Sequence, residues 1–279
     1  MKTWFITGAS RGMGRVWAEA ALRRGDRVTI TARSVESVRS LAEQFGEAAF
    51  VLALDVTKPD QVRDAVAQAH EHFGRLDVVL NNVGYPLVGT VEEVSEDDVR
   101  AVFDANYLGT LRVIQAALPF LRQQGSGHIL GVSSTLGHVA MPVIGMYCAT
   151  KWAFEALHES LAAEVQSFGI KVSIIEPGAY ATEFGKPGTA GMAAPMEAYA
   201  GIRNAVFSGM GTMERGDPQA TAEAVLKLVD ADDPPLRLIL GSHGLPQLRA
   251  TYASRLETWE AWKSVANQAQ GVSTTMATR

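Results

Sequence analysis

The apolar positions of this chain follow two alternating patterns over its first 180 residues. Short, nearly continuous apolar runs predict strands at residues 4–7, 27–31, 48–54, 76–80, 128–133 and 171–175. Between them, helical spacing predicts helices at residues 12–24, 34–45, 58–73, 95–123 and 147–168. Strands with uninterrupted apolar character are typical of sheets covered on both faces. The alternation therefore predicts an α/β fold, with a parallel sheet, right-handed crossovers and helices on both sides.

Small and polar residues mark the expected helix ends. Ser34 and Ser95 stand where N-caps are expected, and the acidic run at residues 96–98 complements the helix dipole of the first turn that follows. Gly46 and Gly74 follow the ends of two predicted helices. These signals agree with the spacing of the apolar positions.

The alternation of strand and helix patterns stops after residue 182. Residues 183–215 are rich in Gly, Pro, Met and Ala, which predicts a mobile lid over an apolar substrate pocket. The larger side chains of this segment are Phe184, Met192, Met196, Tyr199, Phe207, Met210 and Met213. A loop packed on the core is the alternative interpretation.

A last helix and strand are predicted at residues 217–241. Residues 245–279 are expected to form a C-terminal helix, at about 245–266, and a frayed tail. No linker or repeat interrupts the pattern, so residues 1–279 are expected to form one domain.

Charge and cysteine usage narrow the class of partner. The net charge of −5 argues against nucleic acid or an anionic membrane surface as partners. Cys148 is the only cysteine, which excludes an intramolecular disulfide and is compatible with a reducing compartment; we expect the cytoplasm. The apolar run before Gly8 is too short for a signal peptide, and no apolar stretch is long enough for a membrane span.

The first predicted strand runs into a glycine-rich turn and then a helix. Glycines at positions 8, 12 and 14 allow a tight turn, a close approach of backbone to a pyrophosphate, and close packing of the helix on the strand. A phosphate then binds the free N–H groups of the helix N-terminus. Such turns also occur without ligands, and this spacing differs from the commoner Gly-x-Gly-x-x-Gly.

Tyr147 and Lys151 lie one turn apart on a predicted helix. A free tyrosine has a pKa of about 10, too high for acid–base chemistry at neutral pH, and a nearby ammonium favours the phenolate. For this spacing by itself, a surface pair is the favoured interpretation.

Together, Thr7-Gly8-x-x-x-Gly12-x-Gly14 and Tyr147-x-x-x-Lys151 resemble the short-chain dehydrogenase/reductase family, in its compact branch. The resemblance covers about residues 3–182 and, more weakly, continues to about 241. It implies a Rossmann-type, doubly wound parallel sheet of about seven strands. Val83 stands where the family's Asn-Asn-Ala-Gly signature has alanine.

The resemblance also implies a set of cofactor-binding residues at the carboxyl ends of the strands, where ligands of open α/β sheets lie. They are Gly8, Ser10, Arg11, Gly12, Met13, Gly14, Arg33, Asp55, Val56, Asn82, Gly84, Tyr147, Lys151, Pro177, Gly178 and Thr182. Asp55 as a helix-entry carboxylate and Asn82 as a turn-capping amide are the alternatives.

The family's catalytic residues map onto Asn106, Ser134, Tyr147 and Lys151. The resemblance implies that Tyr147 is the acid–base group, that Ser134 holds the substrate oxygen, and that Lys151 holds the nicotinamide ribose. Asn106 is implied to disturb its helix and to hold a water that relays protons to the lysine. An amide that only satisfies the core is the alternative for Asn106.

The end of the second predicted strand indicates which nicotinamide cofactor is used. Enzymes that use NAD place a carboxylate there, whereas this chain has Ala32 followed by Arg33, with Arg11 in the glycine turn. Two guanidiniums can clamp a 2′-phosphate, so we expect NADP(H). Two solvated surface arginines are the alternative.

The whole pattern predicts an NADP(H)-dependent oxidoreductase that interconverts a carbonyl and an alcohol on a lipophilic small molecule by direct hydride transfer. No metal is expected, because the six histidines show no ligand spacing. Family members commonly form dimers or tetramers, which implies a homo-oligomer here. An inactive cofactor-binding scaffold and a sugar-nucleotide epimerase of the extended branch are the alternatives; the complete catalytic set disfavours the first, and length and glycine spacing disfavour the second.

Overall fold

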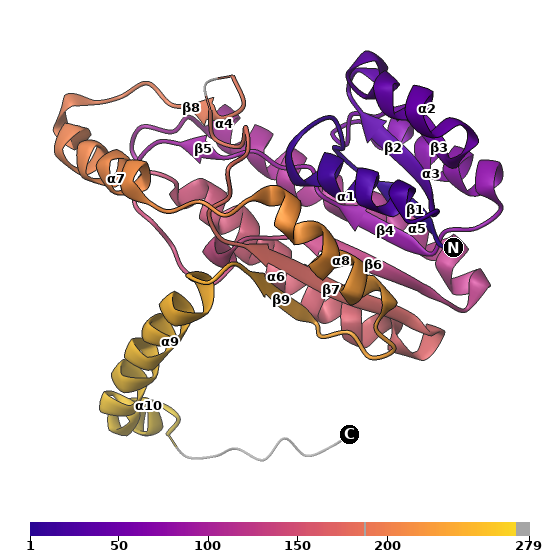
Figure 1. Ribbon diagram of the computed structural model, residues 1–279. Coiled ribbons are helices and arrows are strands. Elements are labelled where there is room, and N and C mark those ends of the chain that lie inside the picture. Colours follow the sequence, from indigo (N-terminus) through magenta and orange to yellow (C-terminus); the bar gives the residue numbers. More distant parts are fainter. Residues whose placement is uncertain (187, 272–279) are drawn as a thin grey trace. The chain divides into compact units, whose positions relative to one another are not determined.

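A seven-stranded parallel sheet lies at the centre of residues 1–241 (Figure 1). The computed structural model describes residues 1–186 and 188–271. In the order β3-β2-β1-β4-β6-β7-β9, the strands are Ala49–Ala53, Arg27–Ala32, Thr3–Ile6, Val78–Asn81, Gly127–Val132, Ile170–Pro177 and Arg237–Leu240. The predicted α/β fold with a doubly wound parallel sheet is confirmed.

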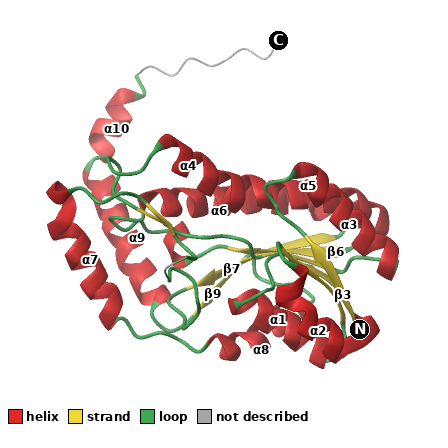
Figure 2. Cartoon of the chain, turned by 90° about the horizontal axis from the view of Figure 1, so that it is seen from above, coloured by secondary structure: helices red, strands yellow, loops and turns green. Residues whose placement is uncertain are grey.

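Helices cover both faces of this sheet (Figure 2). On one face lie α1 (Gly12–Arg23), α2 (Arg39–Phe45) and α8 (Thr221–Asp230), packed around a core that includes Trp17, Ile30 and Val225. On the other face lie α3 (Pro59–Phe73), α5 (Gly109–Gln124) and α6 (Gly145–Val165), over a second core that includes Phe5, Val113 and Leu161. The strands are buried from both sides, which explains their continuous apolar sequence.

The strand order reverses at β1. Ile6 at its end pairs with Ile30 of β2 on one side and with Leu80 of β4 on the other. The connections that leave β1 and β4 therefore diverge to opposite faces and open a crevice at the carboxyl ends of these strands. The glycine turn follows β1 and Asn82 follows β4, so both border this crevice.

Two predicted helices differ from the structure in their continuity. The helix expected at 95–123 is divided into α4 (Glu96–Phe103), a π-helical segment (Asp104–Leu108) and α5. The helix expected at 34–45 begins as a 3₁₀ turn at Val35–Val38 and becomes α2 only afterwards. The cap expected at Ser34 is wrong, because its side chain makes no capping hydrogen bond. The cap at Ser95 is confirmed, since its hydroxyl accepts a hydrogen bond from the Asp98 amide.

Residues 183–215 contain regular structure. Strand β8 (Gly191–Met192) pairs in parallel with β5 (Leu87–Val88), and α7 (Ala200–Thr212) follows. The lid predicted for this segment stays a prediction, but its framework is a strand pair and a helix.

The C-terminal residues form a second unit, Ser242–Arg279, described here by itself. The helix predicted at about 245–266 is present as α9 (Gly244–Ala261) and continues, after a break at Trp262, as α10 (Lys263–Ala269). The end of the predicted tail, residues 272–279, lies outside the described residues. Whether the whole chain behaves as one domain stays a prediction.

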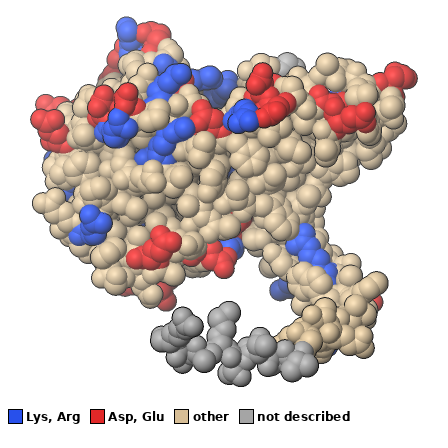
Figure 3. All heavy atoms as spheres, turned by 180° about the vertical axis from the view of Figure 1, so that it is seen from behind, with Lys and Arg blue, Asp and Glu red and all other residues tan. Residues whose placement is uncertain are grey.

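The surface carries mixed charge. Lys and Arg side chains are interspersed with Asp and Glu on the face that Figure 3 shows, so this face has no large field of one sign. In the described part of the chain, none of the helices combines the length and apolarity needed to cross a membrane.

Candidate active site

The glycine turn after β1 is held by Asn82. Gly8 and Gly12 adopt positive φ angles of 69° and 59°, which favour glycine. The Asn82 side-chain amide donates to the carbonyl oxygens of Thr7 at 3.2 Å and Gly8 at 2.9 Å. A Cβ on Gly14 would overlap this amide and lie 2.6 Å from the Gly8 carbonyl oxygen. Asn82 thus caps the turn with its side-chain amide, as the alternative interpretation of this residue has it. The same amide shapes the glycine turn where the phosphate is predicted to bind.

The segment after β7 lies across from this turn. Gly178 donates its N–H to the Leu240 carbonyl at 3.1 Å, which fixes the backbone directly after Pro177. The Thr182 Cβ lies 3.9 Å from the place of a Cβ on Gly12. Thr182 therefore lies beside the glycine turn, and Pro177 and Gly178 precede it at the end of β7. Their contact with a cofactor stays a prediction.

Asp55 and Val56 follow β3. The Asp55 carboxylate accepts hydrogen bonds from the Thr57 N–H at 3.0 Å and its hydroxyl at 2.8 Å. Burial favours the neutral acid, but the Thr57 hydrogen bonds and the nearby charges of Lys58 and Arg33 prevail and lower the Asp55 pKa. Val56 is buried, and a Cβ on Gly109 would lie 2.9 Å from its Cβ, so α5 approaches closely here.

The residues expected to select the cofactor lie at the end of β2 and in the glycine turn. Ala32 ends β2 with 4% exposure. Arg33 follows it and is exposed, as is Arg11 at the N-terminus of α1. Ser10 and Met13, from the same turn, are half-buried, and Met13 packs on the α1 core.

Tyr147 and Ser134 form the first part of the catalytic group. Tyr147 lies in the first turn of α6 and is 5% exposed. Burial raises its pKa above the usual value, while a hydrogen bond with the Ser134 hydroxyl acts in the opposite direction. The Ser134 oxygen also accepts from the Leu136 N–H at 3.1 Å, so its position is fixed by the turn after β6.

Lys151 lies one turn further along α6 and is buried. Its ammonium donates to the Val132 carbonyl oxygen at 2.7 Å and lies 5.8 Å from the centre of the Tyr147 ring. Burial lowers the Lys151 pKa to about 8. The predicted tyrosine–lysine pair is thus an internal pair, and the surface interpretation is wrong.

Asn106 links the π-helical segment between α4 and α5 to α6. It lies at 0% exposure in the π-helical segment, where the widened turn marks the disturbance implied by the family. Its side-chain oxygen accepts from the Tyr85 N–H at 3.0 Å, and its amide donates to the Tyr85 carbonyl at 2.9 Å and to the Thr150 hydroxyl at 3.2 Å. A Cβ on Gly84 would meet both the Asn106 oxygen, at 3.4 Å, and the Lys151 ammonium, at 3.6 Å.

Comparisons with known proteins agree with this geometry. Residues 2–192 match the short chain dehydrogenase family. The chain belongs to this family. It is similar to oxidoreductase BOA17 of Botryotinia fuckeliana, with 43% identity over 243 residues that cover 86% of this chain and 89% of that protein.

Solved structures of related proteins have the same fold. A short-chain dehydrogenase from Streptomyces avermitilis shares 36% identity with a TM-score of 0.88, covering 96% of this chain and 97% of its own. An alcohol dehydrogenase from the archaeon Thermococcus sibiricus, complexed with 5-hydroxy-NADP, shares 30% identity with a TM-score of 0.73 over 88% of this chain and 97% of its own. The chain is accordingly an NAD(P)-dependent oxidoreductase of the short-chain dehydrogenase family.

The sequence pattern gives no role to Thr150 or Val143, which lie beside this site, and predicts Phe184 only as part of the lid. Thr150 donates to the Tyr147 carbonyl at 2.7 Å and so links Asn106 to the start of α6. Its place directly before the lysine was the available signal. Phe184, an exposed residue of the predicted lid, has its ring centre 5.7 Å from that of Tyr147. Val143, just before α6, has a φ of 71°, a strained value for a β-branched residue.

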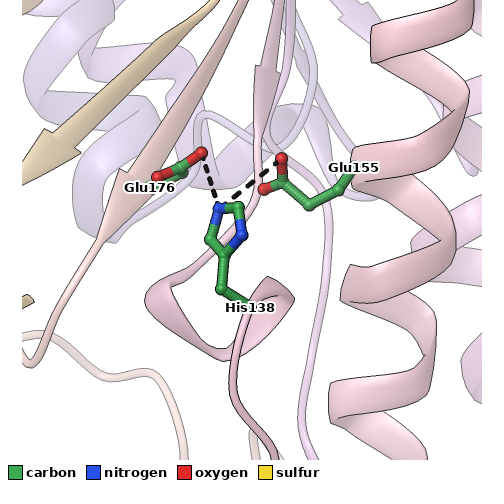
Figure 4. A group of neighbouring side chains, drawn as sticks. All are labelled: His138, Glu155 and Glu176. Carbon is green, nitrogen blue, oxygen red and sulfur yellow. Dashed lines mark hydrogen bonds and ion pairs between the residues drawn. The ribbon is translucent and has the colours of Figure 1, made fainter. Parts of the chain in front are cut away.

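One buried group behind the site escaped the sequence analysis. His138, Glu155 and Glu176 lie with ligating atoms within 4.8 Å of one another (Figure 4). Glu155 comes from α6, Glu176 from β7, and His138 from the turn after β6. Because they belong to three separate elements, no local spacing could reveal them.

Proposed function

We propose that this short-chain dehydrogenase is an NADP(H)-dependent enzyme that interconverts a carbonyl and an alcohol on a lipophilic small molecule by direct hydride transfer. The observation that supports this most strongly is the convergence of three groups. The Ser134 hydroxyl, the Tyr147 phenol and the Lys151 ammonium meet at the carboxyl end of β6, next to the crevice. This set suits proton transfer to or from a substrate oxygen.

The residues around the crevice fit a nicotinamide dinucleotide. A Cβ on Gly8 or Gly14 would meet Val83 or Asn82, so the glycines let the turn pack closely against the segment after β4. Glycine-rich turns of this kind let backbone approach a pyrophosphate. Arg11 and Arg33 would hold a 2′-phosphate, and Lys151 would hold the ribose next to the nicotinamide. NADP(H), when bound, supplies or receives the hydride. The similarity to the alcohol dehydrogenase complexed with 5-hydroxy-NADP supports the choice of the phosphorylated cofactor.

In the direction of reduction, the residues handle the proton and the developing charge. Tyr147 donates its phenolic proton to the substrate oxygen while the carbonyl carbon is reduced. The Ser134 hydroxyl donates a hydrogen bond to the same oxygen and stabilises its negative charge. The Lys151 ammonium stabilises the tyrosinate left behind, because an opposite charge nearby lowers the pKa of a phenol. Oxidation of an alcohol reverses each step.

The surroundings of Tyr147 support a lipophilic substrate. The tyrosine is part of an apolar cluster with Val88, Val143, Ile144 and Cys148, against which Val206 of α7 packs. The predicted lid segment also has large apolar side chains that are exposed, namely Phe184, Met192 and Phe207. Such side chains adapt to varied apolar ligands.

A panel of ketones, aldehydes and alcohols assayed with NADPH and NADP⁺ tests this proposal through the change in nicotinamide absorbance. Turnover of lipophilic carbonyls or alcohols, with a higher kcat/KM for the phosphorylated cofactor, is the expected result. Tight cofactor binding without turnover across the panel would instead favour the inactive scaffold.

A further inference from the structure

Three ionisable side chains follow one another along α6. Tyr147, Lys151 and Glu155 are each four residues apart, so they lie on the same side of the helix at successive turns. Tyr147 is 5%, Lys151 4% and Glu155 5% exposed. The proposed mechanism uses Tyr147 and Lys151 but gives no role to the buried carboxyl group of Glu155.

Lys151 and Glu155 contact consecutive residues at the end of β6. The Lys151 ammonium donates to the Val132 carbonyl oxygen at 2.7 Å. Glu155 lies beside the hydroxyl of the next residue, Ser133: a Cβ on Gly137 would lie 2.8 Å from the Ser133 oxygen and 3.0 Å from a Glu155 carboxylate oxygen. The ammonium and the carboxylate therefore both lie at the end of β6, where the charge of Glu155 acts on Lys151.

Glu155 belongs to a compact charge cluster with His138 and Glu176 (Figure 4). His138 Nε2 lies 3.0 Å from a Glu176 carboxylate oxygen and 3.9 Å from one of Glu155. Arg237 Nε, from β9, lies 3.1 Å from the same Glu155 oxygen and 3.5 Å from the same Glu176 oxygen. The remaining oxygens, Glu155 Oε1 and Glu176 Oε2, are buried as well.

A divalent cation is a poor occupant for this cluster. The two carboxylate oxygens that face His138 are the ones that contact Arg237, so a metal ion there would meet the guanidinium. A protonated His138 and Arg237 already balance the two carboxylates. The hydrogen bond with Glu176 raises the His138 pKa, which favours this protonated form.

We propose that Glu155 is a positioning residue of the hydride-transfer reaction: its carboxylate keeps the buried Lys151 ammonium protonated, and His138, Glu176 and Arg237 hold that carboxylate in place. The inference rests on the proposed function, because it assigns Glu155 a role through Lys151. Neither the sequence pattern nor the family resemblance assigned Glu155, His138, Glu176 or Arg237 a role.

The electrostatic influences on Lys151 support the proposal that Glu155 keeps its ammonium protonated. Burial favours the neutral amine and lowers the Lys151 pKa to about 8, and the Glu155 charge is the influence that raises it. Burial also raises the pKa of Glu155, while Ser133, His138 and Arg237 favour its ionised form against the charge of Glu176. His138 and Arg237 are thus the members of the cluster that oppose burial and favour a negative charge on Glu155.

The charged and titratable groups that face this pair come from four elements. On α6 they are Tyr147, His158 and Glu159. His138 comes from the turn after β6, Glu176 from β7 and Arg237 from β9. Of the carboxylates among these, Glu159 is the surface member, at 63% exposure of its side chain, and it pairs with the outer side of Arg237.

Glu159 provides a matched control for Glu155. It is the same residue type, on the same helix, with the same arginine partner, but one turn further from Lys151 and in solvent. Glu155→Gln should therefore lower the titration midpoint of Lys151, whereas Glu159→Gln should leave it unchanged. Arg237→Gln removes a cation that holds the Glu155 carboxylate in its ionised form, so it should act in the same direction as Glu155→Gln, but more weakly.

The first measurement needs neither cofactor nor substrate. The side-chain NMR signals of isotope-labelled lysines are followed between about pH 6 and 11 in the protein as purified. In Glu155→Gln the Lys151 midpoint should fall by about one pH unit. It should stay within about 0.2 units in Glu159→Gln, where solvent screens the charge, and fall by a smaller amount in Arg237→Gln.

The second measurement is the pH profile of carbonyl reduction. Burial raises the pKa of Tyr147 and lowers that of Lys151 to about 8, so on this proposal the lysine loses its proton first and sets the alkaline limb of kcat. Glu155→Gln should then move this limb to lower pH by the same amount as the NMR midpoint. Glu155→Asp, which keeps the charge, should restore most of the shift. A simply structural role would lower activity without moving the limb.

Three results would overturn the proposal. One is an unchanged Lys151 midpoint in Glu155→Gln, and another is an equal fall in Glu159→Gln. The third is a stoichiometric divalent metal in the purified protein, lost in Glu155→Gln, since the metal and not the carboxylate would then be the principal charge. If Glu155→Gln does not fold, an unchanged Lys151 midpoint in Arg237→Gln takes the place of the first of these results. Since the NMR titration needs no turnover, failure of the proposed function would be recognised separately.

Discussion

Glu93 and Arg203 form a buried ion pair between residues 110 positions apart in the chain. Arg203 Nη2 lies 2.6 Å from one Glu93 carboxylate oxygen and Nε 2.9 Å from the other, and neither side chain is more than 8% exposed. Glu93 also accepts hydrogen bonds from the Thr90 and Met196 N–H groups, at 2.7 and 2.8 Å. The Glu93 carboxylate therefore connects α7 and the segment before it to the loop that precedes α4.

Glu93→Gln should loosen the predicted lid. The variant leaves the Arg203 guanidinium buried without its counter-charge, which is costlier than losing both partners. Amide exchange should become faster in residues 196–212, and the substrate KM should rise more than the cofactor KM. Tyr199→Phe, which removes an exposed hydrogen bond to Glu92, is the control. Unchanged exchange in Glu93→Gln would show that the lid is held elsewhere.

The same ion pair predicts an acid dependence of the lid. The hydrogen bond from Arg203 lowers the Glu93 pKa to about 2. A carboxyl group with a lowered pKa contributes stability that is complete above its usual pKa and is lost as the pH falls through the folded value. Protection of residues 196–212 should thus decline between about pH 4.5 and 2, and Glu93→Gln should remove this dependence. A decline of the same size in the variant would contradict it.

Tyr147→Phe should reduce kcat by about 100-fold or more, while cofactor affinity stays nearly unchanged. The ring remains in its apolar cluster, and only the oxygen that carries the proton leaves. Steady-state kinetics and fluorescence titration of NADPH measure the two effects.

Lys151→Ala is the informative partner of this variant. It should weaken both turnover and cofactor binding, because the proposed lysine holds the ribose as well as the tyrosinate. Activity of more than a few per cent in Tyr147→Phe would defeat the assignment of Tyr147 as the acid–base group.

The sequence predicted those parts of the molecule that depend on local pattern. The strands were recognisable because both faces of each strand are buried, and the glycine turn because Gly8 and Gly14 have no room for a side chain. Tyr147 and Lys151 were recognisable because one helical turn brings them together. Their burial was not, since it depends on how α6 packs against the rest of the sheet and the helices.

What the sequence could not show depends on contacts between distant elements. Glu93 and Arg203 look like ordinary surface charges until α7 is placed against the loop before α4. Glu155 and Glu176 likewise read as solvated carboxylates, because only the pairing of β6, β7 and β9 brings Arg237 and His138 between them. Ser34 shows the converse: its position suits a cap, but the chain continues as a 3₁₀ turn and the cap is not made.

Gly14→Ala should destabilise the protein and weaken cofactor binding together. The new Cβ would overlap the Asn82 amide and lie 2.6 Å from the Gly8 carbonyl oxygen, and backbone cannot move away cheaply. We expect a loss of about 1–3 kcal/mol in the free energy of unfolding. Gly209→Ala in α7 is the control, because a Cβ there meets nothing within 4 Å. It should stabilise by about 0.5–1 kcal/mol. Equal effects of the two changes in denaturant unfolding would contradict the cradle geometry.

The proposed preference for NADP(H) predicts a reversible choice of cofactor. Ala32 ends β2 where a carboxylate would repel a 2′-phosphate, and the exposed Arg33 and Arg11 lie where they could attract one. One charge-assisted contact contributes about 1.5–3 kcal/mol, enough for about tenfold discrimination or more.

The double variant Ala32→Asp, Arg33→Ala should therefore prefer NADH, because it introduces repulsion toward the phosphate and removes attraction. The measured quantity is the ratio of kcat/KM for NADPH and NADH. Ala32 is buried, so thermal unfolding of the variant is followed alongside. Arg39→Ala is the matched control: it removes an exposed arginine of α2 that pairs with Glu36, and the ratio should not change. Because the 2′-phosphate is the one difference between the two cofactors, a higher kcat/KM with NADH in the unmodified protein would mean that Arg11 and Arg33 are solvated surface arginines.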